Sequence, residues 1–318
     1  MIPEQSIRSL RAMAAAMAGD MPVSGHLVAM LADDVERHGP IGEMVSGHPE
    51  AATPLFCLRV LAGVKMLVSS GRATDLAAHF EHFLSKTGDQ DYEARGRELF
   101  RDTLFRYREE ISAALDRPVQ QHMPGRAGFL LRGLGMLRAP RIRLLELGAC
   151  AGLNLILDQY RWFGVGWEWG DRNSSVRLAA DGPNPGDFTI VERAGCDLAP
   201  RDPGDTHDAM VLRSFIPIER DIEELELDDA LKLASASRIR VEKADAVSWL
   251  RNELAKPVEK GVYTVVWHSL FWWYLSPEEH AEVESIIATS ARRMRLARIC
   301  YEPPAWGKDL RLQTTVYS

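Results

Sequence analysis

The sequence predicts an α/β protein in which an all-α region precedes a mostly parallel sheet. Two observations carry this prediction. Up to about residue 140 the apolar side chains recur at helical spacing, and beyond it short β-rich runs alternate with helical stretches. We therefore expect a helical domain over residues 1–140 and a sheet domain over 141–318. The β-rich runs are 142–147, 188–197, 239–244, 263–269 and 298–302.

Two long helices are expected in the first domain. Thr53 and Pro54 offer a capping residue and a first-turn proline, and Gly71 offers a stop. The residues between them are almost wholly apolar, so this helix should be central. A second long helix is predicted by apolar residues at steps of three or four, namely Phe100, Leu104, Tyr107, Ile111 and Leu115.

Composition limits the class of protein. The chain has 318 residues, of which 46% are hydrophobic, enough for a full core. Its longest apolar run, 55–68, contains Arg59 and Lys65 and is too short to cross a bilayer. With no leader-like N-terminus, we expect a cytoplasmic protein. The four cysteines are scattered, which predicts neither a disulfide nor a metal site.

Charge argues against a nucleic-acid partner, and the short apolar run argues against a membrane. The net charge is −7, whereas binding to a phosphate backbone needs a basic surface. A cluster of arginines does occur, but it falls at the end of a predicted helix, where cations favour the dipole and solvent. We expect a small-molecule partner, and the oligomeric state is left open. The clustered residues are Arg292, Arg293, Arg295 and Arg298.

The helix after Ser276 has the clearest start signal in the chain. Ser276 is a capping residue, Pro277 suits the first helical position, and Glu279 completes a reciprocal capping box. The helix should run to about Arg293. It carries structural information only.

The first β-rich run leads into a glycine turn and then a helix-forming stretch. Gly148 and Gly152 let the backbone turn sharply and approach a ligand. A dinucleotide turn would want glycine where Cys150 and Leu153 stand, and Glu146 would repel a pyrophosphate. The acid suits a ligand with an ammonium or sulfonium group, although it could simply form a cap or pair. The pattern resembles motif I of class I S-adenosylmethionine-dependent methyltransferases.

Other candidate residues end the later strands, because ligands of open α/β sheets lie at the carboxyl ends of strands. Asp197 could accept both ribose hydroxyls, and Asp245 could accept the adenine amino group. Either could instead cap a following helix. His268 could face the reactive methyl group or be a satisfied core histidine. Ser269 follows it, and then comes an aromatic cluster that could be core or a wall for a flat substrate, Trp272, Trp273 and Tyr274.

Asp171 competes with Asp197 for the ribose because it lies nearer the usual spacing from the glycine turn. We prefer Asp197. The segment 162–178 is better explained as an inserted hairpin, with turn chemistry at 173–175.

A resemblance extends over most of the chain. The segments that carry it are 119–126, 146–155, 195–200, 267–269 and Glu302-Pro303. They resemble an uncharacterised bacterial family catalogued as a domain of unknown function, which itself looks like a methyltransferase core behind an N-terminal helical domain. The resemblance implies a Rossmann-like methyltransferase sheet and bound S-adenosylmethionine or its demethylated product. It supplies no substrate.

This chain departs from the family pattern in two places. Members usually have Thr-Asn-Glu where Gln121, His122 and Met123 stand, and Ser where Cys150 stands. The matching polar positions are Gln120 and Arg126. The chain also ends soon after Glu302, whereas a complete sheet of this kind needs roughly 40 further residues. We therefore expect a shortened C-terminal end.

These features together predict a methyltransferase that acts on a small oxygen or nitrogen nucleophile by direct displacement. His268 is the candidate general base, and the helical domain is the candidate lid over the substrate. The expected substrate contacts are Ser269 and the aromatic cluster. The expected cofactor-binding residues are Glu146, Gly148, Cys150, Gly152, Asn154, Asp197, Asp245 and Arg126.

Two alternatives remain. Cys150 in place of the middle glycine, together with the short C-terminal end, favours a non-catalytic sensor or scaffold that binds S-adenosylmethionine. An NAD-dependent enzyme is disfavoured by the spacing of Gly148 and Gly152.

Overall fold

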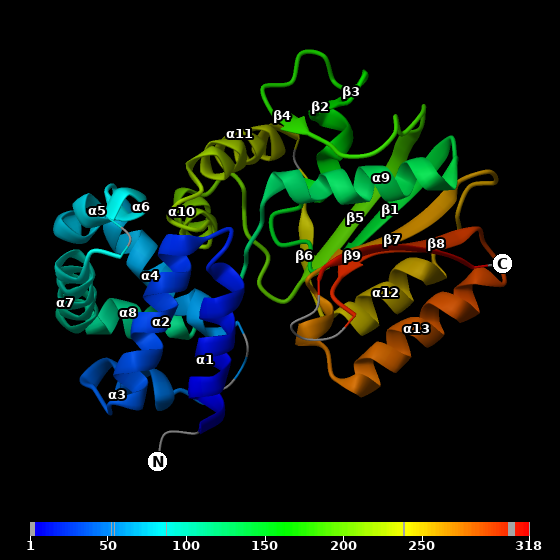
Figure 1. Ribbon diagram of the computed structural model, residues 1–318. Helices are drawn as coiled ribbons and strands as arrows, with labels where there is room; N and C mark the ends of the chain where they lie inside the picture. Colours follow the sequence, from blue (N-terminus) through cyan, green and yellow to red (C-terminus); the bar gives the residue numbers. More distant parts are fainter. Residues whose placement is uncertain are drawn as a thin grey trace. The chain divides into compact units, whose positions relative to one another are not determined.

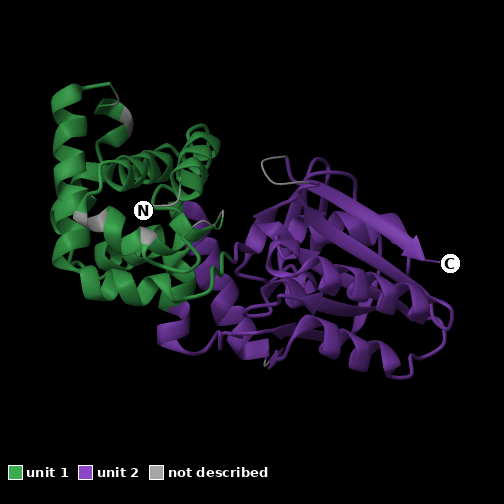
Figure 2. Ribbon diagram, turned by 90° about the horizontal axis from the view of Figure 1, so that it is seen from below, with its two compact units in different colours: residues 1–121, 210–221 green, residues 122–209, 222–318 purple. Residues whose placement is uncertain are grey.

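The computed structural model describes residues 4–51, 53, 55–86, 88–237, 239–304 and 309–317 (Figure 1). The chain divides into two compact units (Figure 2). The first comprises Met1–Gln121 and Met210–Asp221, and the second comprises His122–Ala209 and Ile222–Ser318. The predicted boundary at residue 140 and this division differ because helix α9 (Ala127–Leu137) packs on the sheet of the second unit.

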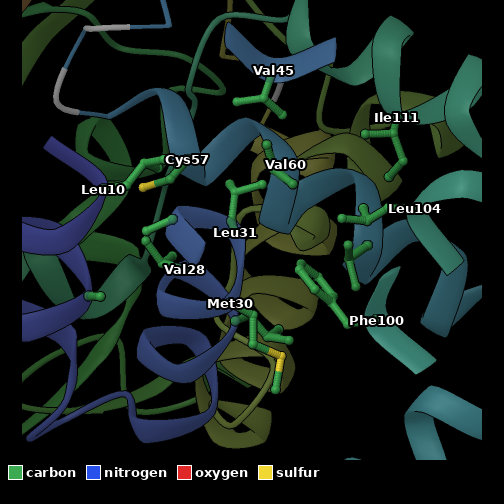
Figure 3. Close-up of a cluster of buried hydrophobic side chains, with 14 of the residues drawn as sticks. Leu10, Val28, Met30, Leu31, Val45, Cys57, Val60, Phe100, Leu104 and Ile111 are labelled. Atoms are coloured by element: carbon green, nitrogen blue, oxygen red, sulfur yellow. The ribbon is translucent and has the colours of Figure 1, made fainter. Parts of the chain in front are cut away.

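The first unit is helical in its described residues, as the spacing of apolar residues predicts. Its core includes a large cluster of buried side chains, among them Val28, Leu31, Val60, Leu104 and Ile111 (Figure 3). The N-terminal helices are α1 (Glu4–Met17), α2 (Pro22–Glu36), α3 (Pro40–Ser46), α4 (Phe56–Ser69), α5 (Thr74–Phe80), α6 (Phe83–Lys86), α7 (Gln90–Arg106) and α8 (Arg108–Leu115).

Both long helices predicted for this unit need adjustment. The apolar helix is α4, which begins at Phe56 after the non-helical cap Leu55; the predicted first-turn Pro54 lies outside the described residues. The second was predicted to be continuous through Tyr107, and this was wrong. The backbone of Tyr107 leaves the helical conformation (φ −112°, ψ 32°) and separates α7 from α8. Apolar spacing continues across the break, so the pattern could not reveal it.

A six-stranded sheet forms the centre of the second unit. Its order is β6-β5-β1-β7-β8-β9, with every neighbouring pair parallel except β8 and β9. The five predicted strands are all present, which confirms an α/β protein with a mostly parallel sheet. The strands are β1 (Arg141–Leu147), β5 (Thr189–Asp197), β6 (Val241–Lys243), β7 (Tyr263–Ser269), β8 (Leu296–Glu302) and β9 (Arg311–Tyr317).

Helices cover both faces of this sheet (Figure 1). On one face α9 approaches β8 closely, since a Cβ on Gly133 would lie 2.6 Å from Ile299 Cγ2. On the other, α12 (Ala246–Ala255) and α13 (Pro277–Ala291) share an apolar cluster with β1 and β7. The capping box predicted at Ser276 and Glu279 is present, and α13 ends at Ala291.

A second sheet of three strands follows the glycine turn. β2 (Arg161–Gly164) pairs antiparallel with β3 (Trp167–Gly170) and parallel with β4 (Arg177–Ala179). The predicted hairpin exists, but its turn was placed wrongly. The turn lies at 165–166, where Gly166 has a φ of +77°, and the segment 173–175 instead leads from β3 to β4.

Four further elements complete the second half of the chain: the 3-10 helices η2 (Leu153–Gln159) and η3 (Trp272–Tyr274), and the helices α10 (Thr206–Ser214) and α11 (Asp221–Ser237). The chain therefore enters a helix at Leu153, as predicted, but with 3-10 geometry rather than α-helical geometry. Across the part of the chain that the structure describes, no helix combines the length and apolar character needed to cross a bilayer.

Candidate active site at the carboxyl edge of the sheet

The turn after β1 has a left-handed backbone at three alternate residues. The φ angles are +70° at Gly148, +51° at Cys150 and +72° at Gly152. Glycine adopts this conformation freely, whereas a side chain makes it costly. Cys150 thus has the left-handed backbone that a glycine would adopt at this position, and its thiol is buried. Nothing in the sequence indicated that this cysteine would be left-handed.

Glu146 ends β1 with its side chain almost wholly buried. Its Oε1 accepts a hydrogen bond of 2.6 Å from the Asn154 amide. Burial raises the pKa of Glu146 to about 8, although the hydrogen bond from Asn154, the nearby Trp267 indole and the charge of Arg126 oppose the shift. Two buried oxygens of this pair, Glu146 Oε2 and Asn154 Oδ1, have no hydrogen-bond partner among the described residues.

Asp197, at the end of β5, joins this strand to the glycine turn. Its Oδ2 accepts the Cys150 backbone N–H at 3.0 Å, and its Oδ1 accepts that of Ala199 at 2.8 Å. Its half-buried carboxylate therefore lies at the rim of the turn, as the strand-end argument predicts.

Two other acidic candidates satisfy local backbone groups. Asp245 is exposed and caps α12 by accepting the Ser248 N–H at 2.8 Å. Asp171 is exposed after β3 and accepts the N–H of Asn173 at 2.9 Å. The capping interpretation of Asp245 is thus met, while contact of either residue with a ligand stays a prediction.

His268 ends β7 with its side chain fully buried, and it is paired with Glu302 at the end of β8. The distance from His268 Nδ1 to Glu302 Oε1 is 2.8 Å. Burial lowers the pKa of His268, while the hydrogen bond and charge of Glu302 raise it. Within the described part of the chain, His268 Nε2 and Glu302 Oε2 are buried without a hydrogen-bond partner.

The segment after β7 packs over this pair. Trp272 stacks on the His268 ring (centroids 4.2 Å apart, planes at 23°), and its indole also stacks on His280 of α13. Phe271 lies against the glycine turn, because a Cβ on Gly148 would be 2.5 Å from its Cδ2. Of the predicted aromatic cluster, Trp272 therefore packs on His268 in this structure.

The remaining substrate candidates are Ser269, Trp273 and Tyr274. Ser269 and Trp273 are half-buried, and Tyr274 is exposed. Their contact with a substrate stays a prediction.

Arg126 ends the short 3-10 helix η1 (Pro124–Arg126). Burial lowers the pKa of this guanidinium, and the charges of Glu302, Tyr301, Tyr274 and Glu146 oppose that shift. Both carboxylates of the site therefore act on Arg126 electrostatically. The charge of Arg126 thus acts on Glu146, which the strand-end argument selected, and on Glu302.

The sequence argument missed Glu302 as a site residue. The rule that found Glu146, Asp197 and His268 also applies to the last residue of the fifth parallel strand, so the signal was present. What the rule could not supply is that the Glu302 side chain points at His268. No group of three or more metal-binding side chains occurs among residues that the structure describes.

The fold and these residues define an α/β protein with an ionisable site at the carboxyl edge of its parallel sheet. Comparison with known families then adds a name. The family described as "Uncharacterized protein conserved in bacteria (DUF2332)" matches residues 8–317, and the chain belongs to this family. No curated protein and no solved structure matches the chain.

Proposed function

We propose that the second unit binds S-adenosylmethionine and transfers its methyl group to a small-molecule nucleophile. The strand order supports this. Numbered along the chain, the five parallel strands lie in the order 3-2-1-4-5, which is that of doubly wound, Rossmann-like nucleotide-binding sheets. In such sheets the ligand lies where the order reverses, here between the carboxyl ends of β1 and β7. Glu146 and His268 stand near those two ends.

The observation that carries the proposal is the pair of buried oxygens left without a donor among the described residues, Glu146 Oε2 and Asn154 Oδ1. Buried acceptors of this kind are uncommon in native proteins. An ammonium group has three N–H donors and could satisfy both oxygens. S-adenosylmethionine carries an ammonium group and a sulfonium charge, and the carboxylate of Glu146 favours both. NAD would instead bring a pyrophosphate beside that carboxylate.

The neighbouring residues fit the other groups of this cofactor. Each oxygen of Asp197 accepts one backbone N–H and retains a lone pair for a ribose hydroxyl. Arg126 suits the carboxylate of the amino-acid end, and Asp245 has an oxygen left over from its cap for the adenine amino group. Since Phe271 lies against Gly148, we expect its ring to move when a ligand approaches the turn.

Titration calorimetry tests the proposal, with S-adenosylmethionine as the probe and NAD as the matched control. Because burial raises the pKa of Glu146 to about 8, we expect part of this carboxyl group to be protonated at pH 7 before a ligand binds. Binding of a cation should release part of that proton, measured as a difference in heat between buffers of different ionisation enthalpy. Failure to bind S-adenosylmethionine at millimolar concentration, or tighter binding of NAD, would overturn the proposal.

Variants locate the binding. Glu146→Gln should abolish the proton release and weaken affinity by roughly 10–100-fold, since a charge-assisted bond is lost. Asp197→Asn should weaken affinity by about 10-fold or more, whereas the capping variant Asp245→Asn should change it less. Equal affinity in the wild type and Glu146→Gln would contradict the placement at the glycine turn.

One observation favours a second function, a sensor or scaffold that binds the cofactor without catalysis. Trp272 and Phe271 pack closely around His268 and the glycine turn, so the site is closed in this structure. A protein that binds S-adenosylmethionine in calorimetry but methylates none of a broad panel of hydroxyl and amine acceptors would support this function.

A further inference from the structure

We propose that Glu302 is a positioning residue, which holds His268 with its proton on Nδ1 so that Nε2 takes the proton of a hydroxyl-bearing methyl acceptor. The hydroxyl acceptor rests on the proposed function. The pairing of Glu302 with His268 stands on the ligand-free structure alone, so the two parts are tested separately.

The tautomer follows from the contacts of Glu302. Its Oε1 lies 2.8 Å from His268 Nδ1 and also accepts the backbone N–H of Phe271 at 2.8 Å. A carboxylate only accepts hydrogen bonds, so Nδ1 must donate, and a neutral imidazole then has its lone pair on Nε2. One oxygen thus fixes both the tautomer of the histidine and the backbone of the segment that covers it.

The surroundings keep His268 neutral. Its side chain is fully buried, and burial lowers its pKa; Glu302 opposes this, while the positive charges of Arg298 and His280 add to the lowering. Trp272 stacks on the ring and restricts its rotation. A neutral imidazole whose Nε2 has no partner among the described residues is suited to receive a proton.

The chemistry of proton removal selects the class of acceptor. A carboxylic acid is already ionised at neutral pH, and a neutral amine attacks with its own lone pair. A phenol, with a pKa of about 10, or an alcohol must lose its proton as it reacts. A buried histidine paired with a carboxylate supplies that step, so the site fits a hydroxyl acceptor.

The transfer is balanced with these groups. The acceptor oxygen forms a bond to the methyl carbon while the carbon–sulfur bond of the sulfonium breaks, and the sulfur keeps the electron pair. The hydroxyl proton passes to His268 Nε2. The imidazolium so formed lies beside Glu302, whose negative charge stabilises it.

A purely structural pair is the competing explanation. It accounts for the bond between Nδ1 and Oε1, but it does not explain why the buried Nε2 of His268 has no hydrogen-bond partner among the described residues. The two explanations also differ in what they predict for the charge of Glu302. Removal of that charge should shift the titration of His268 if Glu302 acts through it.

The first experiment is nitrogen NMR on the full chain labelled at histidine, without ligand. We expect His268 to be protonated at Nδ1 and not at Nε2 at pH 7. In Glu302→Gln the titration of His268 should shift to lower pH, because a negative charge that favours the imidazolium is lost. The resonances of His79, which stacks on Tyr92 in the first unit, should not shift and serve as the internal control.

A proton on Nε2, or an unchanged His268 titration in Glu302→Gln, overturns the positioning role. Glu302→Asp provides a second variant, with the charge kept, if the glutamine variant fails to fold. It should restore the wild-type tautomer, and a different tautomer in that variant also counts against the role.

The second experiment adds phenol to the protein saturated with S-adenosylhomocysteine, with benzoate as the control. Phenol should shift the Nε2 resonance of His268, whereas benzoate should not. No shift with phenol, or a larger shift with benzoate, overturns the hydroxyl class. If S-adenosylhomocysteine and S-adenosylmethionine both fail to bind while the tautomer is as expected, the proposed function and the hydroxyl acceptor fall, and the positioning role of Glu302 remains.

Discussion

Gly148 offers a quantitative test of how the aromatic segment packs on the glycine turn. A Cβ at this position would lie 2.5 Å from Cδ2 and 3.2 Å from Cε2 of Phe271, and the backbone φ of +70° disfavours any side chain. Gly166 is a matched control, since its φ is +77° but no atom lies within 4 Å of its Cβ position. Gly148→Ala and Gly166→Ala therefore share the backbone effect and differ in the contact.

The magnitudes follow from these two contributions. A left-handed alanine costs about 1–2 kcal/mol, part of which is returned by the reduced freedom of the unfolded chain. Gly166→Ala should thus lower the free energy of unfolding by about 1 kcal/mol. Gly148→Ala adds about 1–3 kcal/mol of overpacking, because the Phe271 ring must shift from its place against the turn to admit the new Cβ. We expect a total of about 2–4 kcal/mol.

Urea unfolding followed by tryptophan fluorescence measures this loss. All eight tryptophans fall within the sequence of the second unit, so the signal reports that unit alone. The double variant with Phe271→Ala should lose less stability than the sum of the single variants, since the contact is then absent. Equal losses in Gly148→Ala and Gly166→Ala would refute the packing of Phe271 on this turn.

Four further substitutions test the stability of the second unit in the same unfolding assay. Cys150→Gly should stay within about 1 kcal/mol of the wild type, because relief of the left-handed backbone offsets the lost thiol packing; a loss above about 2 kcal/mol would contradict this. Glu146 has its pKa raised to about 8, so it stabilises the fold below pH 4.5 and this contribution is lost as the pH rises to about 8. Glu146→Gln should remove that part of the pH dependence, at most about 1.4 kcal/mol per pH unit, and an unchanged profile counts against the shift. Glu253→Gln should cost about 2–4 kcal/mol because it leaves the fully buried Arg143 without its buried partner, whereas Glu192→Gln, at the half-exposed partner of the same guanidinium, should cost less than about 1 kcal/mol.

The sequence predicted most of the second unit because its signals are local. A buried parallel strand is a short apolar run, and the start of a capped helix such as α13 can be recognised from four consecutive residues. The order of the strands is a different matter. It depends on which runs pair, and the parallel pairing of β1 with both β5 and β7 joins residues far apart in the chain.

The direction of the side chains at the site could not be predicted from the sequence either, because it also depends on how distant strands pair. The contact between His268 and Glu302 needs the register of β7 against β8, in which His268 is level with Cys300. Glu302 lies two residues further along β8 and so points to the same face of the sheet. Nothing local to either residue encodes that register. The break at Tyr107 is comparable, because the spacing of apolar residues continues across it and does not reveal it.

Asp197 and Asp245 show that one distinction could have been drawn from the sequence. Both are acids that end or follow a strand, and either could cap a helix. After Asp245 the chain continues as helix α12, and the carboxylate is used as a cap. After Asp197 come Pro200 and Pro203, which favour loop over helix, and α10 begins only at Thr206.

The prolines therefore leave the Asp197 carboxylate without a helix to cap, and it turns instead to the backbone N–H of Cys150. A carboxylate that accepts a hydrogen bond from the glycine turn is better placed to contact a ligand there than one that caps a helix. The residues that follow a strand-end acid thus carry as much information about its role as the acid does, and here they make Asp197 a better candidate than Asp245 for the proposed ligand contact.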